Sequence, residues 1–273
     1  MRRHVTFQCA DDTLAGTLDD AAGAAGLLIV SGGNEIRCGA HGGQAELAQH
    51  FAQAGHPVFR YDRRGIGDSE GDNGEFESSA DDIAAAVAAF RAEAPHVTHI
   101  AAFGNCDAAT ALALFQMGLS IDTLILANPW VIEQEASGEA DEEAPTTPSA
   151  AAIRARYWAR IKNPRSIIDL FSGKINLRKL VGGLAKASQR EEASGLAVRL
   201  AKALGETDRP VQILLAKRDT TALAFFAAWK DTVFEEARSR ENIRLTEYDS
   251  ASHSFADAGA KAWLKAQIGD MLK

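Results

Sequence analysis

Short apolar runs alternate along the chain with longer segments of helical periodicity, and this alternation limits the folds that the chain can adopt. Residues 25–33, 56–62 and 97–103 contain apolar runs typical of buried strands, and residues 42–55 and 78–95 have helical patterns. Strands that alternate with helices form a mostly parallel sheet with helices on both faces. We therefore predict a single α/β domain.

Further elements extend this pattern toward both ends of the chain. Residues 5–19 predict an initial hairpin with Asp11 and Asp12 in its turn, and Ser79 is expected to cap the helix of residues 78–95, with Asp82 near its positive end. The later elements are strands in residues 122–130, 209–219 and 242–249, one helix in residues 221–240 and a last helix from about Asp257.

The alternation is interrupted between the sixth and seventh predicted strands. Residues 133–149 are acidic and rich in Pro, Ser and Thr, which is typical of a loop. Residues 150–205 are helical in pattern and carry twelve cations against three anions. We predict a first core segment at 1–131, an acidic loop with a basic helical cap at 132–205, and a second core segment at 206–273.

Three residues that could form a nucleophilic site each follow a predicted strand. Cys106 lies in the stretch "GNCDA" between a strand and a helix, Asp219 follows "VQILLAKR", and His253 lies in the polar loop "SASHSF". The carboxyl ends of parallel strands meet at one edge of a sheet, where α/β enzymes place reactive groups. The chain order of nucleophile, acid and histidine is that of α/β-hydrolases.

Each of these residues also has a structural interpretation. A single cysteine is more often a small buried residue than a nucleophile, an aspartate after a strand often caps a helix, and a histidine in a polar loop is often only solvated. The three together favour a Cys106–His253–Asp219 triad.

Two glycine-containing loops fit the same plan. The loop "SGGNEIR" follows the strand after which such folds place one oxyanion donor. We expect this donor to be the backbone N–H of Gly33 or Asn34. The second donor is expected to be the N–H of Asp107. The loop "DRRGIGDS" is expected to be structural. Arg37 either contacts an anionic group of the substrate or pairs with a neighbour.

These motifs resemble those of the α/β-hydrolases over the full chain. More closely, "SGGNEIRCGAHGG", "RYDRRGIGDSEG", "GNCDAA", "LANPWV", "SHSF" and the cap stretch at 154–180 resemble the exosortase A system-associated hydrolases of type 1. The resemblance implies an α/β-hydrolase fold with a helical cap and a cytoplasmic hydrolase linked to exopolysaccharide and protein-sorting genes. Ala108 stands where many such elbows have glycine.

The predicted reaction is hydrolysis of a carboxylic ester or thioester through a covalent acyl-enzyme on Cys106. Two alternatives remain open: transfer of the acyl group to a sugar or amine acceptor, and a scaffold that has kept the fold without the chemistry. The basic cap predicts capture of an anionic or carrier-linked substrate, although it could instead contact the acidic body or anionic lipid headgroups.

Composition excludes several other classes. A formal charge of −8 gives no support to nucleic-acid binding, and no apolar run approaches the roughly 20 residues that span a bilayer. No secretory signal is readable at the start. The three scattered cysteines are typical of free thiols in a reducing compartment, not of a disulfide framework or a zinc site. We expect a cytoplasmic enzyme without metal or cofactor, and the oligomeric state stays open.

Overall fold

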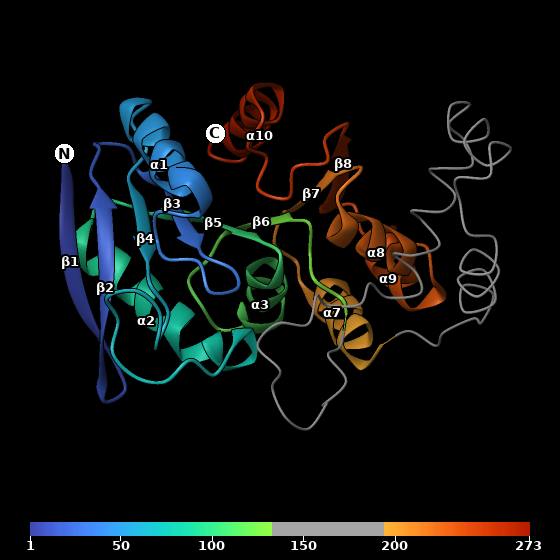
Figure 1. Cartoon of the computed structure of the whole chain (residues 1–273), viewed down its shortest axis with the longest axis horizontal. Coiled ribbons are helices and arrows are strands. Elements are labelled where there is room, and N and C mark those ends of the chain that lie inside the picture. Colours follow the sequence, from blue (N-terminus) through green and yellow to red (C-terminus); the bar gives the residue numbers. More distant parts are fainter. Residues whose placement is uncertain (133–193) are drawn as a thin grey trace, which may run out of the picture.

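The computed structural model describes residues 1–132 and 194–273, and its centre is one eight-stranded sheet (Figure 1). The strand order is β1-β2-β4-β3-β5-β6-β7-β8. Strands β1 and β2 form an antiparallel hairpin, β2 is antiparallel to β4, and all remaining neighbours are parallel. The strands are β1 (Arg2–Cys9), β2 (Asp12–Asp19), β3 (Ala25–Val30), β4 (Val58–Tyr61), β5 (His99–Asn105), β6 (Thr123–Ala127), β7 (Val211–Ala216) and β8 (Ile243–Tyr248).

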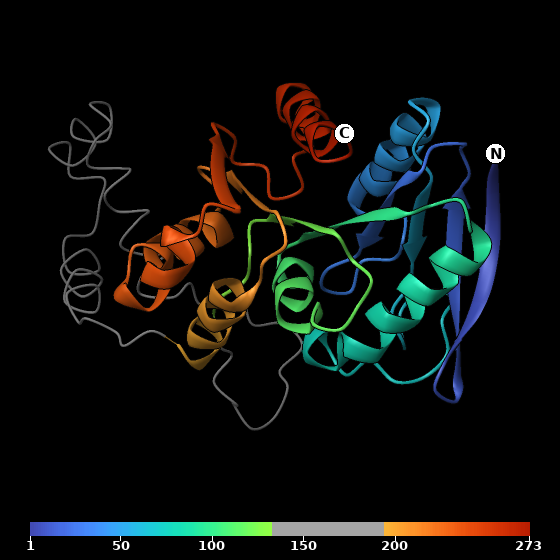
Figure 2. The same ribbon diagram turned by 180° about the vertical axis from the view of Figure 1, so that it is seen from behind.

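Helices cover both faces of the sheet (Figures 1 and 2). Helices α1 (Gly43–Gln53) and α10 (Ala258–Asp270) lie on one face. The other face carries α2 (Ser79–Glu93), α3 (Asp107–Phe115), α7 (Gly195–Glu206), α8 (Thr220–Trp229) and α9 (Glu235–Ser239). Short 3-10 turns at Ala40–Gly42, Phe76–Ser78 and Thr232–Phe234 precede α1, α2 and α9. This arrangement confirms the predicted α/β-hydrolase architecture of a mostly parallel sheet between two helical layers.

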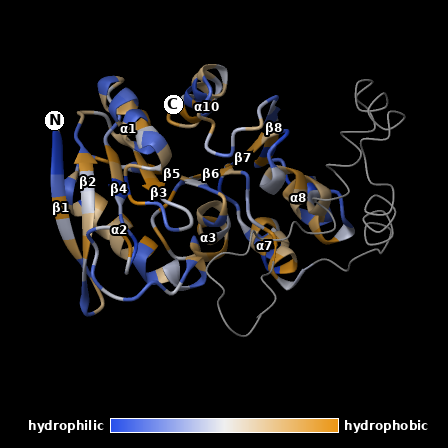
Figure 3. Ribbon diagram, viewed as in Figure 1, coloured by the Kyte–Doolittle hydropathy of each residue, from blue (hydrophilic) through white to orange (hydrophobic). Residues whose placement is uncertain are grey.

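The two faces of the sheet form two hydrophobic cores because successive side chains of a strand point to opposite faces. In β3, Leu27 and Ile29 pack toward α1 and α10, whereas Leu28 and Val30 pack toward α2 and α3. A central parallel strand can therefore be apolar along its whole length, as Figure 3 shows for β3.

Some predicted local features differ in the structure. The first hairpin turns at Ala10 and Asp11, with φ +52° at Ala10, and Asp12 already pairs with Cys9 as part of β2. Ser79 is not a cap: it is the first residue of α2 and is buried, and its hydroxyl accepts a hydrogen bond from Arg63.

The helix predicted for residues 221–240 is also interrupted. Helix α8 ends at Trp229, and the carboxylate of Asp231 accepts from the N–H of Val233 to begin a new turn. Asp231 therefore caps a second helical segment, which continues as α9.

The predicted cap lies mostly outside the described residues, which omit 133–193. The described part that follows, α7, buries Ala197, Leu200 and Leu204 in the core formed with α3 and the Thr232–Phe234 turn. This helix therefore packs as part of the α/β body. In the described residues, no helix has the length and apolar character needed to cross a membrane.

Candidate active site

Cys106 lies at a sharp turn between β5 and α3, with φ +63° and ψ −127°. Non-glycine residues rarely adopt a positive φ, and such strain is typical of functional sites. The end of β6 holds the turn, because the Cys106 N–H donates to Ala127 O (2.9 Å) and the Cys106 carbonyl accepts from the N–H of Trp130 (3.2 Å).

The strand and the helix approach closely at this turn. A Cβ at Gly104 would lie 2.8 Å from the backbone carbonyl of Ala108, so only glycine fits there. Ala108, at the position where many such elbows have glycine, is buried in this structure. The turn therefore has the geometry of a nucleophile elbow.

Asp219 and His253 come together at the same edge of the sheet. His253 Nδ1 lies 3.0 Å from Asp219 Oδ2, and the same carboxylate oxygen accepts from the N–H of Ala222 (3.1 Å). Asp219 therefore both caps α8 and pairs with His253. The structural role and the functional role considered for this aspartate are compatible.

The environment of His253 favours its charged form. Hydrogen bonds with Asp219 first and with Cys106 second raise the pKa of His253 from 6.5 to about 10, against the opposing effect of burial. The imidazole thus lies between the carboxylate and the sulfur. The structure brings all three predicted residues into one group.

The backbone of the predicted oxyanion loop is held on both sides. The Gly33 N–H donates to Asp107 Oδ1 (2.7 Å), and the Gly33 carbonyl accepts from Arg63. The Asp107 carboxylate therefore occupies the Gly33 N–H, which favours Asn34 among the two donors expected in this loop.

The same contacts orient the next peptide group. A trans peptide directs its carbonyl and its N–H in opposite directions, so the N–H of Asn34 points away from Arg63. The N–H of Asp107 belongs to the first turn of α3 and has no acceptor within the helix. Asn34 and Asp107 are thus the remaining two of the three predicted donors.

Arg37 is part of the loop structure. Its guanidinium forms ion pairs with the buried carboxylate of Asp62 and with Asp68 (2.8 Å), and it donates to the Thr17 hydroxyl (3.1 Å). Burial alone would lower the pKa of Arg37, but the hydrogen bond to Asp68 and the charge of Asp62 raise it. Of the two roles considered for Arg37, these contacts match pairing with neighbours and not the binding of a substrate anion.

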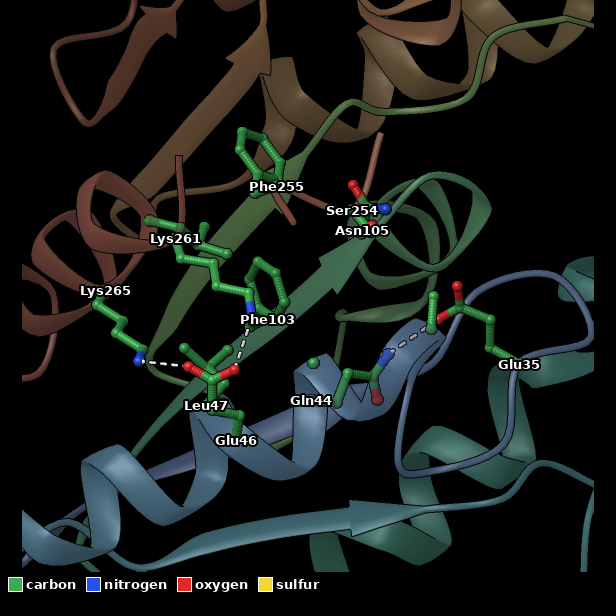
Figure 4. Close-up of a pocket in the computed structure, with 13 residues that line it drawn as sticks. Glu35, Gln44, Glu46, Leu47, Phe103, Asn105, Ser254, Phe255, Lys261 and Lys265 are labelled. Atoms are coloured by element: carbon green, nitrogen blue, oxygen red, sulfur yellow. Dashed lines mark hydrogen bonds and ion pairs between the residues drawn. The ribbon is translucent and has the colours of Figure 1, made fainter. Parts of the chain in front are cut away.

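A cavity of about 60 Å³ lies beside the three residues, between α1 and α10 (Figure 4). Asn105 and Ser254, the chain neighbours of the cysteine and the histidine, line one end. At the other end, Lys261 and Lys265 form ion pairs with Glu46 and lower its pKa to about 2. The apolar part of the lining consists mainly of Leu47, Phe103, Phe255 and Leu264.

The described residues contain no group of three or more histidine, cysteine or acidic side chains placed to hold a metal ion. One residue of the site was not predicted as functional. Asn128, which follows β6 in the stretch "LANPW", is fully buried and donates to the carbonyl of His253. An asparagine directly after an apolar strand is a weak signal, because most such residues only begin a turn.

Comparison with known proteins is consistent with this geometry. The family model described as serine aminopeptidase, S33, matches residues 24–257. The chain belongs to this family of α/β-hydrolases. The family's description names a serine, whereas the residue at the turn between β5 and α3 of this chain is Cys106. No curated protein sequence shows significant similarity to the chain.

Solved structures with the same fold share little sequence with this hydrolase. An esterase of Pyrococcus furiosus is 15% identical with a TM-score of 0.65, covering 100% of this chain and 90% of that chain. A putative aryl esterase from Burkholderia cenocepacia is 17% identical (TM-score 0.59, coverage 99% and 98%). A thioesterase domain from the curacin biosynthetic pathway is 13% identical (TM-score 0.58, coverage 98% and 100%).

Proposed function

We propose that this α/β-hydrolase cleaves carboxylic esters or thioesters through a covalent acyl-enzyme on Cys106. The observation that carries the proposal is the position of His253, which is hydrogen-bonded to Asp219 (3.0 Å) and whose pKa is raised first by Asp219 and then by Cys106. Membership of a hydrolase family and the structural likeness to esterases and a thioesterase support the same reaction class.

The first half of the reaction forms a thioester. The Cys106 proton passes to His253, and the imidazolium held by Asp219 favours the thiolate beside it. The thiolate attacks the carbonyl carbon of the substrate, and the N–H groups of Asp107 and Asn34 stabilise the resulting oxyanion. When the tetrahedral intermediate collapses, the leaving group takes the proton from His253 and the acyl group stays on sulfur.

The second half of the reaction releases the acid. His253, now neutral, accepts a proton from a water molecule that attacks the thioester carbonyl. The second tetrahedral intermediate expels the Cys106 thiolate, which restores the thiolate–imidazolium pair and frees the carboxylic acid.

The experiment is a screen of p-nitrophenyl esters and acyl thioesters with the wild-type protein, Cys106→Ala and Cys38→Ala. Cys38 is a second free, partly exposed cysteine and serves as the matched control. We expect Cys106→Ala to be folded and inactive and Cys38→Ala to keep its activity. A folded Cys106→Ala protein with wild-type activity contradicts the proposal.

We also infer a biological setting from the sequence motifs. The resemblance to the exosortase-associated hydrolases supports a role in an exopolysaccharide-linked pathway, and the free cysteines support a cytoplasmic location. The basic segment supports an anionic acyl substrate, although most of that segment lies outside the described residues. A salt series comparing kcat/KM for a neutral and an anionic ester tests this last inference, which fails if salt affects both equally.

A further inference from the structure

Asn128 joins three segments that carry the proposed triad. Its side-chain oxygen accepts from the N–H of Ala216 at the end of β7 (2.8 Å). Its Nδ2 donates to Asn105 Oδ1 at the end of β5 (3.1 Å) and to the carbonyl of His253 (3.0 Å). The acid is three residues beyond Ala216 and the nucleophile directly follows Asn105, so one side chain connects all three functional segments.

The contacts leave the amide of Asn128 one orientation. An N–H donor faces its oxygen and two oxygen acceptors face its nitrogen, so a flipped amide would lose all three hydrogen bonds. The side chain is 0% exposed, and water cannot replace a lost partner there.

The backbone at Asn128 is also specialised. The residue has φ +42°, a conformation that asparagine tolerates better than most residues, and its own N–H donates to Leu214 O (2.9 Å). The chain thus leaves the sheet at β6 with the Asn128 side chain turned toward the histidine loop.

We propose that Asn128 is a positioning residue that keeps His253 aligned with both Cys106 and Asp219. The loop that carries His253 is not part of a strand. The hydrogen bond from Asn128 to the His253 carbonyl connects this loop to the carboxyl edge of the sheet. This inference rests on the proposed function, because it assigns Asn128 to the site formed by that triad.

Two substitutions separate alignment from folding. Asn128→Asp keeps the shape of the side chain but places a carboxylate oxygen against two oxygen acceptors. Asn128→Gly removes all three side-chain hydrogen bonds and adopts the positive φ without strain. The glycine variant keeps the test informative if the buried charge of the aspartate prevents folding.

Asn242 provides the matched control. Its Nδ2 also donates to two oxygen acceptors, here the backbone carbonyls of Thr207 (3.0 Å) and Arg209 (2.7 Å), but Asn242 directly precedes β8 and lies at the amino edge of the sheet. Asn242→Asp and Asn242→Gly therefore lose the same kind of bond away from the triad.

The readouts are kcat and KM for a p-nitrophenyl ester and the rate at which iodoacetamide alkylates Cys106, followed by peptide mass spectrometry. A displacement of about 1 Å at a catalytic group can cost about 10²-fold in rate. We expect the Asn128 variants to lower kcat and the alkylation rate by about 10–100-fold with KM changed by less than about threefold. The Asn242 variants are expected to keep both rates even where their thermal stability falls equally.

Wild-type alkylation and kcat in folded Asn128→Gly overturn the positioning role, as does an equal loss in the Asn242 variants. Failure of the proposed function has a different signature. In that case, Cys106 of the wild-type protein is alkylated no faster than Cys38, and Cys106→Ala keeps its activity.

Discussion

Replacing Asp219 by asparagine separates its two structural roles. Asparagine caps a helix as well as aspartate does, so the hydrogen bond from the Ala222 N–H to the side chain is kept. What is lost is the negative charge beside His253 Nδ1, the first cause of the raised histidine pKa.

The cost in stability is expected to be small and pH-dependent. A histidine whose pKa rises on folding from 6.5 to about 10 contributes stability that is complete below pH 6.5 and is lost as the pH rises through about 10. Because the His253 side chain is 40% exposed, solvent screens the pair, and we expect Asp219→Asn to lower the free energy of unfolding by no more than about 1 kcal/mol at low to neutral pH.

The cost in activity is expected to be much larger. The oxygen that keeps the Ala222 bond still faces Nδ1, but without the negative charge the pKa of His253 falls, so the imidazolium that stabilises the Cys106 thiolate is weakened. We expect kcat/KM for a p-nitrophenyl ester to fall by about 10²-fold or more, yet by less than in His253→Ala.

Asp257→Asn is the matched control for this experiment. Asp257 caps α10 through the N–H of Ala260 (2.8 Å), lies in the same loop as His253, and bonds the Ser250 hydroxyl (2.7 Å). This variant should keep its kcat/KM. The reasoning is refuted if Asp219→Asn is as active as Asp257→Asn while both have wild-type melting curves.

Three further outcomes follow from the structure. Gly104→Ala forces a Cβ against the α3 backbone and should lower the free energy of unfolding by roughly 3 kcal/mol in urea titrations, whereas Gly43→Ala, with no atom within 4 Å of its added Cβ, should not. Arg37→Gln leaves the buried Asp62 carboxylate without its cation and should lower the free energy of unfolding by roughly 3 kcal/mol. The ratio of KM for an anionic and a neutral ester should stay unchanged in this variant. A selective rise in KM for the anionic ester would instead indicate that Arg37 binds the substrate. The kcat/KM of the wild-type protein should fall as the pH rises through about 10, where His253 loses its proton, and this alkaline limb should move toward neutral pH in Asp219→Asn.

The sheet and the convergence of the three candidate residues at one edge could be predicted from the sequence, because both follow from short-range patterns. Apolar runs of strand length mark the buried strands, and the carboxyl ends of parallel strands meet at one edge. Cys106, Asp219 and His253 each follow such a run, so their convergence required no knowledge of side-chain contacts.

The features that could not be predicted depend on partners far away in the chain. Serine is a common helix cap, but the Ser79 hydroxyl accepts a hydrogen bond from Arg63 instead. The Gly33 N–H is occupied by a carboxylate 74 residues away. The order of residue types along the chain does not specify which of several nearby donors and acceptors pair in three dimensions.

The break between α8 and α9 has a different cause. Residues 221–240 keep a helical pattern of apolar residues throughout, and Asp231 alone signals the interruption. One aspartate within a helical pattern does not by itself end a helix. Here the contacts of Arg238 with the carbonyls of Trp229 and Asp231 stabilise the interrupted form.

The central claim is that Cys106 forms the acyl-enzyme, and intact-protein mass spectrometry during turnover tests it most directly. The protein is mixed with excess p-nitrophenyl ester, quenched in acid within the first turnovers, and digested to locate the adduct. The account predicts one acyl group per chain on the Cys106 peptide, a slower rate of labelling in His253→Ala, and no adduct there in Cys106→Ala. Continued hydrolysis by Cys106→Ala, or an acyl group that accumulates at wild-type rate on another residue, would contradict it.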